Sequence, residues 1–374
     1  MDRVDRVDQY DADLVPVTGP PLPAAGPVAP QRAASPGAAG AALAPAGLPS
    51  LSLELFPPRP GVHASQTWGA LDRLLGVLPD FVSVTYRPTF APDPDGGPGV
   101  CAVREHNPAE DVVTHVLATS RVPLMAHLTC IGYRRRDVVE IVRLFLGLGV
   151  RRFLALRGDP PRGTRASDVP GELRYASDLV RVIREVEDEY FGDGARHLQV
   201  AVAAYPACED LEAEVEVLAA KQEAGADLAI TQVFYDAQDY LSLSRAASYS
   251  GVVMPVLPGI IPLTDLRRLT RLESLTGVQV PADLSATLRR AEGAQAVAAG
   301  IDATLRLATQ VLDGGAPGVH LYTFNRTRPA LDVVSHLRLG GIFRGQEPDR
   351  ETQHEVDLAY LNATPGGDRR PSVW

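Results

Sequence analysis

Short apolar segments rich in β-branched residues alternate along this chain with longer segments of helical periodicity. In the longer segments, such as 135–150, apolar residues recur at i, i+3, i+4 and i+7, which is the repeat of an amphipathic helix. Strands that alternate with helices are joined by crossovers and therefore run parallel to one another. We predict strands at 51–56, 81–86, 124–130, 153–158, 199–206, 228–235, 252–259 and 318–325.

Eight strand-helix units match the count expected of a (β/α)8 TIM barrel, which is the fold class that we predict. A doubly wound open sheet is the alternative fold. No GxGxxG follows a predicted strand and no GxxxxGK[ST] is present, so the sequence does not support a Rossmann or P-loop nucleotide site.

Composition divides the chain into three parts. Residues 1–48 are mostly Ala, Pro and Gly, cannot bury enough apolar surface to offset the entropy of ordering, and are predicted to be a disordered extension. Residues 49–345 hold the predicted barrel, which would be the catalytic domain. Residues 346–374 are polar and are predicted to form a C-terminal helix followed by a loose tail.

Charge and cysteine content limit the class of partner. The formal net charge is -10, which argues against a nucleic-acid-binding surface. No apolar run reaches the roughly 20 residues that a membrane span needs, and the N-terminus lacks a signal-peptide pattern. The three cysteines have no CxxC spacing, which argues against a disulfide framework or a structural zinc site. We therefore expect a cytoplasmic protein with no metal and no membrane partner.

Polar side chains gather where the predicted strands end. In a (β/α)8 barrel the chemistry lies at the carboxyl ends of the strands, so these side chains would surround one mouth. The sequence therefore predicts a ligand site there. Its candidate residues are Glu54, Thr85 with Tyr86, His127 with Thr129, Arg157 with Asp159, Tyr205, Gln232, and Tyr322 with Arg326.

The strand-end segments also carry a family likeness. In chain order they read SLELFPPRP, FVSVTY, AHLTCIG, LALRGDPP, YASDL, AGADLAITQVFYD, VLPGIIP and GVHLYTFNR. Over roughly residues 50–337 the sequence resembles the methylenetetrahydrofolate reductase family. The resemblance implies a flavin-dependent barrel that reduces 5,10-methylenetetrahydrofolate to 5-methyltetrahydrofolate, with NAD(P)H as hydride donor and FAD as carrier. It does not choose NADH or NADPH, and it leaves association into a homo-oligomer open.

The resemblance implies catalytic roles for Glu54 and Asp159. Glu54 matches the catalytic glutamate: a carboxylic acid in a partly apolar mouth can have a raised pKa and protonate a folate nitrogen, which creates an iminium for hydride attack. Asp159 matches an aspartate that meets both flavin and pterin, and its carboxylate can accept two pterin N–H groups. The implied substrate-binding residues are Glu54, Asp159, Gln232, Tyr322 and Arg326.

Further positions match flavin contacts in the family. Taken alone, His127 would read as a core residue and Lys221 as either a phosphate ligand or a solvated helix lysine. Cys130 is expected to be a small buried residue. The implied FAD-binding residues are Thr85, His127, Arg157, Gly158, Asp159, Tyr175, Ala176, Ala204, Tyr205 and Lys221.

The sequence departs from the family pattern after 81–86. Arg87 stands where a Gly- and Ser-rich loop usually begins, and the loop to Val100 is rich in Pro and Asp, which puts tight FAD binding in question. Arg87 or Arg104 could meet a phosphate instead. Glu209 replaces an expected histidine, and Leu272 lies near the place of a stacking aromatic.

These departures leave three interpretations open. The first is an FAD-dependent methylenetetrahydrofolate reductase. The second is a divergent paralogue with weak or no flavin binding, which passes hydride directly or acts on another one-carbon substrate. The third, a non-catalytic folate-binding barrel, is disfavoured because Glu54, Asp159 and Gln232 are retained.

Overall fold

The computed structural model describes residues 49–58, 64–92, 100–161, 163–291 and 293–343. The predicted extension at 1–48 and the predicted helix and tail at 346–374 lie outside these residues. The strands are β1 (Ser50–Leu55), β2 (Phe81–Val84), β3 (Thr89–Pro92), β4 (Val100–Val103), β5 (Leu124–Thr129), β6 (Arg152–Leu156), β7 (Gln199–Ala204), β8 (Leu228–Thr231), β9 (Val256–Leu257), β10 (Gly259–Ile260) and β11 (Gly318–Tyr322).

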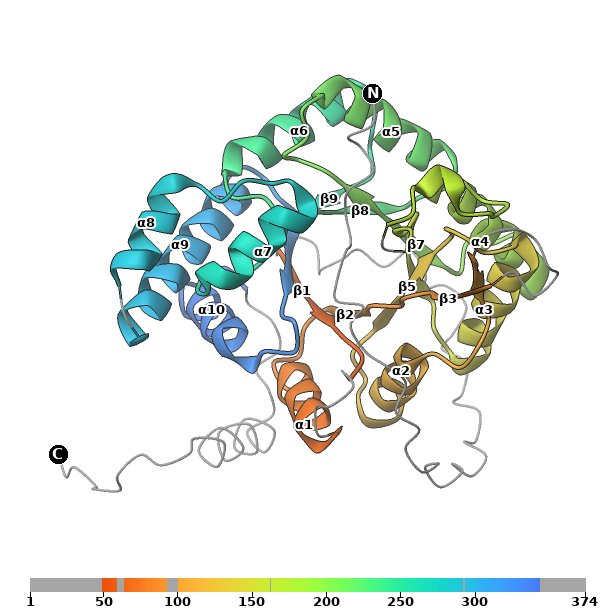
Figure 1. Cartoon of the computed structure of the whole chain (residues 1–374), viewed down its shortest axis with the longest axis horizontal. Coiled ribbons are helices and arrows are strands. Elements are labelled where there is room, and N and C mark those ends of the chain that lie inside the picture. The colour runs from red at the N-terminus through yellow and green to blue at the C-terminus, as the bar shows by residue number, and fades with distance from the viewer. Residues whose placement is uncertain (1–48, 59–63, 93–99, 162, 292, 344–374) are drawn as a thin grey trace.

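The helices form a ring around the main sheet (Figure 1). They are α1 (Ala64–Leu75), α2 (Pro108–Thr119), α3 (Arg135–Leu148), α4 (Ala176–Phe191), α5 (Leu211–Glu223), α6 (Ala237–Tyr249), α7 (Leu266–Thr276), α8 (Ala282–Arg290), α9 (Gly293–Asp313) and α10 (Thr327–Leu339). None of them, within the described ranges, has the length and apolar character that crossing a bilayer requires.

The main sheet is a nearly closed parallel barrel. Its strand order is β10-β11-β1-β2-β5-β6-β7-β8-β9, so its two ends belong to neighbouring strands that only Pro258 separates. Proline has no N–H to donate, and it divides the predicted run 252–259 into two short strands. The Pro258 carbonyl still accepts from the His320 amide at 2.9 Å, and the Gly259 amide donates to Thr231 Oγ1 at 2.9 Å. The barrel prediction is confirmed and the open sheet is wrong.

Alternation along each strand sorts the side chains into two cores. Leu51, Leu53 and Leu55 of β1 pack in the large cluster formed with the helices. Between them, Ser52 and Glu54 face the barrel interior, as expected for a strand whose side chains alternate between two faces. The interior has its own apolar cluster, made by Phe81, Met125, Leu154, Ala201, Leu228, Ile230 and Leu257.

Seven of the eight predicted strands end one to four residues earlier than their sequence patterns indicate, and the last of them shows why. The run 318–325 stops at Tyr322 because Phe324 and Asn325 adopt positive φ values of 51° and 56°. Asparagine adopts positive φ values more readily than most other residues with a side chain. Here Asn325 Oδ1 accepts from the Phe56 amide at 2.9 Å, and its Nδ2 donates to the Phe56 carbonyl at 2.7 Å. The break therefore joins the segments that follow β1 and β11.

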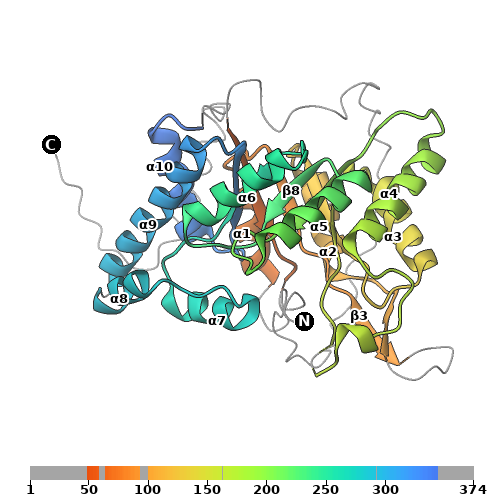
Figure 2. The same ribbon diagram turned by 90° about the horizontal axis from the view of Figure 1, so that it is seen from above.

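A feature absent from the predictions follows β2. Residues on both sides of the Pro- and Asp-rich loop pair as an antiparallel hairpin of β3 and β4, with Phe90 opposite Ala102. Seen from above, β3 lies along the same side of the molecule as α7 (Figure 2). The hairpin is separate from the barrel sheet.

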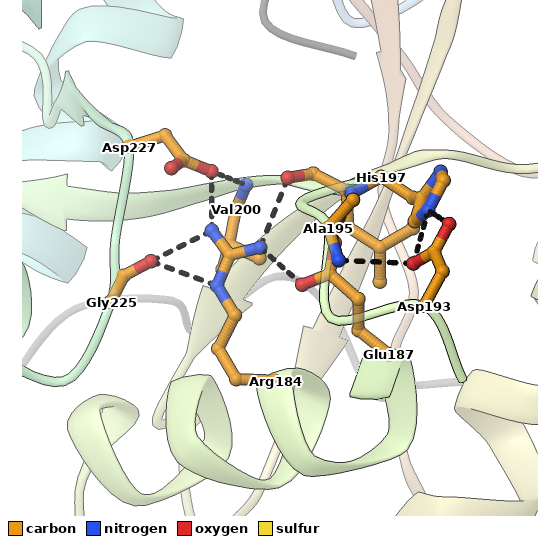
Figure 3. A network of polar contacts seen from close by, with 9 residues as sticks. Arg184, Glu187, Asp193, Ala195, His197, Val200, Gly225 and Asp227 are labelled. Atoms are coloured by element: carbon orange, nitrogen blue, oxygen red, sulfur yellow. Dashed lines mark hydrogen bonds and ion pairs between the residues drawn. The ribbon is translucent and has the colours of Figure 1, made fainter. Parts of the chain in front are cut away.

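An ionic network centred on the buried Arg184 lies where β7 and β8 begin, at the opposite end of these strands from their carboxyl ends (Figure 3). Arg184 of α4 is 8% exposed; its Nη1 donates to Glu187 Oε2 at 2.6 Å and its Nη2 to Asp227 Oδ2 at 2.5 Å. The guanidinium also donates to the carbonyls of Leu198 and Gly225. The two carboxylates accept in turn from backbone amides beside β7, so one arginine joins α4, β7 and the turn before β8.

Candidate active site

A cavity of ≈ 300 Å³ opens at the carboxyl ends of the barrel strands. This volume is at the lower end of the range of small-molecule sites. The structure brings many of the predicted site residues together on its wall. They are Glu54, Thr85, His127, Gly158, Asp159, Tyr205, Gln232 and Tyr322.

Glu54 is held in place from two sides. Its side chain is almost fully buried, and Oε1 accepts from Thr85 Oγ1 at 2.9 Å. Its backbone carbonyl accepts from Thr323 Oγ1 at 2.5 Å, which fixes the end of β1. His127 Nδ1 lies 3.8 Å from the same carboxylate oxygen. His127 is neutral because burial lowers its pKa to about 3. Glu54 is therefore the member of this pair that can donate an acidic proton into the cavity.

Two buried histidines line the cavity, His127 from β5 and His320 from β11. Burial lowers the pKa of each to about 3, and the charge of His320 further lowers that of His127. His320 Nδ1 is 2.8 Å from Ser52 Oγ, whereas Nε2 of each ring has no hydrogen-bond partner among the described residues. Both rings are therefore neutral near neutral pH and offer a polar atom toward a ligand.

These histidines should make stability depend on pH. Their pKa values in the folded protein lie far below the unfolded value of about 6.5. Between these two values the histidines bind protons in the unfolded chain but not in the folded one. Stability is therefore lost as pH falls from about 6.5 toward 3, by up to about 1.4 kcal/mol per pH unit for each histidine. We expect His320→Gln to reduce this slope in urea unfolding between pH 6.5 and 4.5. Equal slopes in the parent and the variant would contradict the assignment.

The RGDPP segment follows β6 and makes a tight turn at the cavity. Gly158 has φ +84°, and a Cβ there would lie 2.8 Å from Thr129 Cβ and 2.9 Å from Ile131 Cγ2. The Arg157 carbonyl accepts from the Ile131 amide at 2.8 Å, which ties the turn to β5. The turn therefore requires glycine, and it places Asp159 on the cavity wall.

Lys221 of α5 reaches the barrel strand β7 beside Tyr205. Its side chain is buried, Nζ donates to the Ala203 carbonyl at 2.8 Å, and it sits 5.6 Å from the centre of the Tyr205 ring. Glu214 beside it accepts from the Tyr205 amide at 3.0 Å. Burial lowers the pKa of Lys221 and raises that of Glu214, and the charge of each opposes the shift of the other. The solvated-lysine interpretation is wrong.

Other predicted residues lie outside the cavity lining. Tyr175 caps α4 with 64% of its surface exposed, and Ala176 begins that helix. Ala204 packs with the helices, and Arg326 Nη1 donates to Asp265 Oδ2 at 3.2 Å. The Arg157 side chain is not part of the lining either. Cys130 is fully buried, as predicted, and burial raises the pKa of its thiol to about 12.

Several lining residues were not identified from the sequence. His320 lies two positions before the predicted strand-end Tyr322, on the same inward face of β11, and that alternation could have revealed it. Phe56 and Phe90 were not singled out, while Leu272 is buried in a separate cluster. Of the two arginines proposed to meet phosphate, Arg87 lines the cavity, and Arg104 Nη1 donates to Glu110 Oε1 at 2.8 Å.

The lining fits a planar heteroaromatic ring better than a whole dinucleotide. His127 Nε2 and Thr129 Oγ1 are buried without hydrogen-bond partners among the described residues, and polar ring atoms could satisfy them. A flavin or pterin ring therefore fits this wall. The residues matched to the rest of FAD fit less well, because Tyr175, Ala176 and the buried Lys221 all lie outside the cavity lining.

Sequence comparisons with known proteins point to the family that the strand-end segments resemble. A sequence model described as methylenetetrahydrofolate reductase matches residues 41–338. The 5,10-methylenetetrahydrofolate reductase of Salmonella typhimurium (strain LT2) is 29% identical over 296 residues, covering 77% of this chain and 90% of the relative. Methylenetetrahydrofolate reductase (NADH) 1 of Arabidopsis thaliana is 29% identical over 309 residues, covering 78% of this chain and 49% of the relative.

A third relative comes from an animal. The probable methylenetetrahydrofolate reductase (NADPH) of Caenorhabditis elegans is 29% identical over 293 residues, covering 77% of this chain and 42% of the relative. The chain thus spans less than half the length of the plant and nematode relatives. The family model covers most of the chain, including every strand of the barrel. The chain therefore belongs to the methylenetetrahydrofolate reductase family of oxidoreductases.

Proposed function

We propose that the protein reduces 5,10-methylenetetrahydrofolate to 5-methyltetrahydrofolate with NAD(P)H as the hydride donor. The observation that carries this proposal is the placement of Glu54, Asp159 and Gln232 on the wall of one cavity, at the active end of a barrel of this family. The overall reaction consumes one hydride and one proton. The cavity must therefore supply a proton donor and a fixed seat for the pterin.

Glu54 would supply the proton. Its transfer to a folate nitrogen opens the bridging methylene into an iminium, and hydride then adds to the methylene carbon to give the methyl group. Thr85 holds Oε1 at 2.9 Å, and the buried position keeps the carboxyl group away from bulk water. General acid catalysis from a positioned carboxyl group is effective because the proton moves within the bound complex.

Asp159 and Gln232 would orient the pterin. The Asp159 carboxylate can accept pterin N–H groups, and charge-assisted bonds of this kind are strong. Gln232 Oε1 accepts from the Val233 amide at 2.7 Å, which directs the remaining amide group toward a ligand acceptor. Tyr322 donates its hydroxyl to the Thr231 carbonyl at 2.6 Å and presents its ring to the cavity.

FAD is the hydride carrier that we propose for this reaction. When bound, it accepts hydride from NAD(P)H and returns it to the folate. Thr85, His127, Gly158, Asp159 and Tyr205 would meet its ring end, since all line the cavity. Direct transfer from NAD(P)H to folate is the second candidate, and it is favoured by the burial of Lys221 outside the cavity lining, where its ammonium group does not face a bound phosphate.

The absorption spectrum of the purified protein tests these alternatives. We expect a flavin spectrum, present at purification or after FAD addition and desalting, that bleaches with NAD(P)H and returns with methylenetetrahydrofolate. A colourless protein that oxidises NAD(P)H only when folate is present would establish direct transfer. A protein that binds folate but shows neither activity would contradict both and identify a non-catalytic barrel.

A further inference from the structure

The β3–β4 hairpin brings an aromatic ring to the cavity. Phe90 lines it, together with Arg87 and Pro88 from the same segment and Pro160 and Pro161 from the turn after β6. Glu54 and His320 are buried, whereas Phe90 is half-buried. Pro88 and Phe90 therefore add apolar surface to a part of the cavity wall that is more exposed than Glu54 and His320.

Contacts near the open end of the hairpin hold its backbone, and Gly132 packs against the Phe90 ring. The Ala102 amide, opposite Phe90, donates to the Gly132 carbonyl at 2.9 Å. Gly132 has φ +76°, and a Cβ there would lie 2.9 Å from Phe90 Cε1. Asn107 Nδ2 donates to the Arg87 carbonyl at 2.6 Å. Because the ring is held before any ligand arrives, little further ordering is needed on binding.

The shape of a folate indicates which ring would meet Phe90. The proposed function seats the pterin against Glu54, Asp159 and Gln232, so the rest of the molecule must leave through the mouth. The group attached to the pterin is the p-aminobenzoyl ring, which carries the glutamate. An aromatic side chain at the mouth is placed to stack on that ring, since offset aromatic pairs attract beyond simple burial.

We propose that Phe90 is a substrate-positioning residue that stacks on the p-aminobenzoyl ring of folate. This inference rests on the proposed function and adds a residue from an element absent from the sequence-based predictions. The hairpin would thus supply the aromatic face that Leu272, buried in another cluster, does not.

A comparison of two ligands tests the role of Phe90. Calorimetric titration would use 5-methyltetrahydrofolate and 5,6-dimethyltetrahydropterin, which lacks the p-aminobenzoylglutamate. We expect Phe90→Leu to weaken folate binding by about 2- to 12-fold and to leave binding of the truncated pterin unchanged. Phe90→Tyr should retain folate affinity because it keeps the ring. In turnover, Phe90→Leu should raise KM for the folate but not for NAD(P)H.

Thr89→Ala provides the matched control, because Thr89 lies on the same strand with an exposed side chain outside the cavity lining. It should bind both ligands as the parent does. Equal weakening of both ligands by Phe90→Leu, or no weakening of either, would overturn the stacking role while leaving the proposed function in place. A parent protein that binds neither ligand would contradict the proposed function itself.

Discussion

Replacing Glu54 with glutamine is expected to lower kcat by about 100- to 10,000-fold, the range that a positioned general acid contributes. Glutamine keeps the size of the side chain and an oxygen that can still accept from Thr85 Oγ1, now 2.9 Å from Glu54 Oε1. It has no acidic proton, so iminium formation loses its donor. KM for the folate should change little. The measurement is steady-state NAD(P)H oxidation with methylenetetrahydrofolate.

Glu140→Gln is the control for this experiment, because Glu140 is exposed on α3 and lies outside the cavity lining. Its kcat should match that of the parent. A Glu54→Gln enzyme that keeps kcat within about threefold of the parent would reject Glu54 as the proton donor, because the expected loss is at least about 100-fold.

Removing the Arg184 guanidinium should lower the free energy of unfolding far more than removing an exposed arginine from the same helix. Arg184→Met keeps an unbranched apolar side chain but leaves the Glu187 carboxylate, at 0% exposure, without its cationic partner. Breaking a buried ion pair from one side costs about 3–5 kcal/mol, because the remaining charge is neither solvated nor paired. Urea unfolding would measure the free-energy difference.

Arg181→Met separates this effect from any loss of charge on α4. Arg181 pairs with Asp178 at 3.0 Å, but its side chain is 53% exposed, and such surface pairs contribute about 0–1 kcal/mol. The Arg184 network lies at the end of the barrel opposite the cavity, so folded Arg184→Met protein should retain its kcat at low temperature. A loss of stability no larger than that of Arg181→Met would contradict the role assigned to the network.

The barrel could be predicted because its signals are local. Each strand is a short apolar run, each helix repeats its apolar residues at 3.6-residue spacing, and strand ends in a parallel barrel meet at one mouth. These local signals predict that Glu54, Thr85, His127 and Asp159 meet at one mouth, and all four line one cavity.

The β3–β4 hairpin and the position of the Lys221 amine could not be predicted, because both depend on contacts between segments far apart in the sequence. The hairpin requires residues 89–92 to pair with 100–103, and its docking depends on the Gly132 carbonyl from another loop. Lys221 shares the buried face of α5 with Leu218, but its charge favours solvent, and only the packing of α5 against β7 shows that its amine meets the Ala203 carbonyl. Tertiary packing decides both outcomes.

The break at Pro258 links ring closure to occupancy of the site. The Tyr322 ring crosses over Gly259 so closely that a Cβ there would lie 2.6 Å from it, and the Tyr322 hydroxyl reaches the Thr231 carbonyl on β8. Tyr322 therefore connects β11 to β8 across the gap between β10 and β9, the two ends of the strand order, and it also lines the cavity. A ligand that contacts Tyr322 in this position stabilises the closed barrel, because binding favours the state that the ligand recognises.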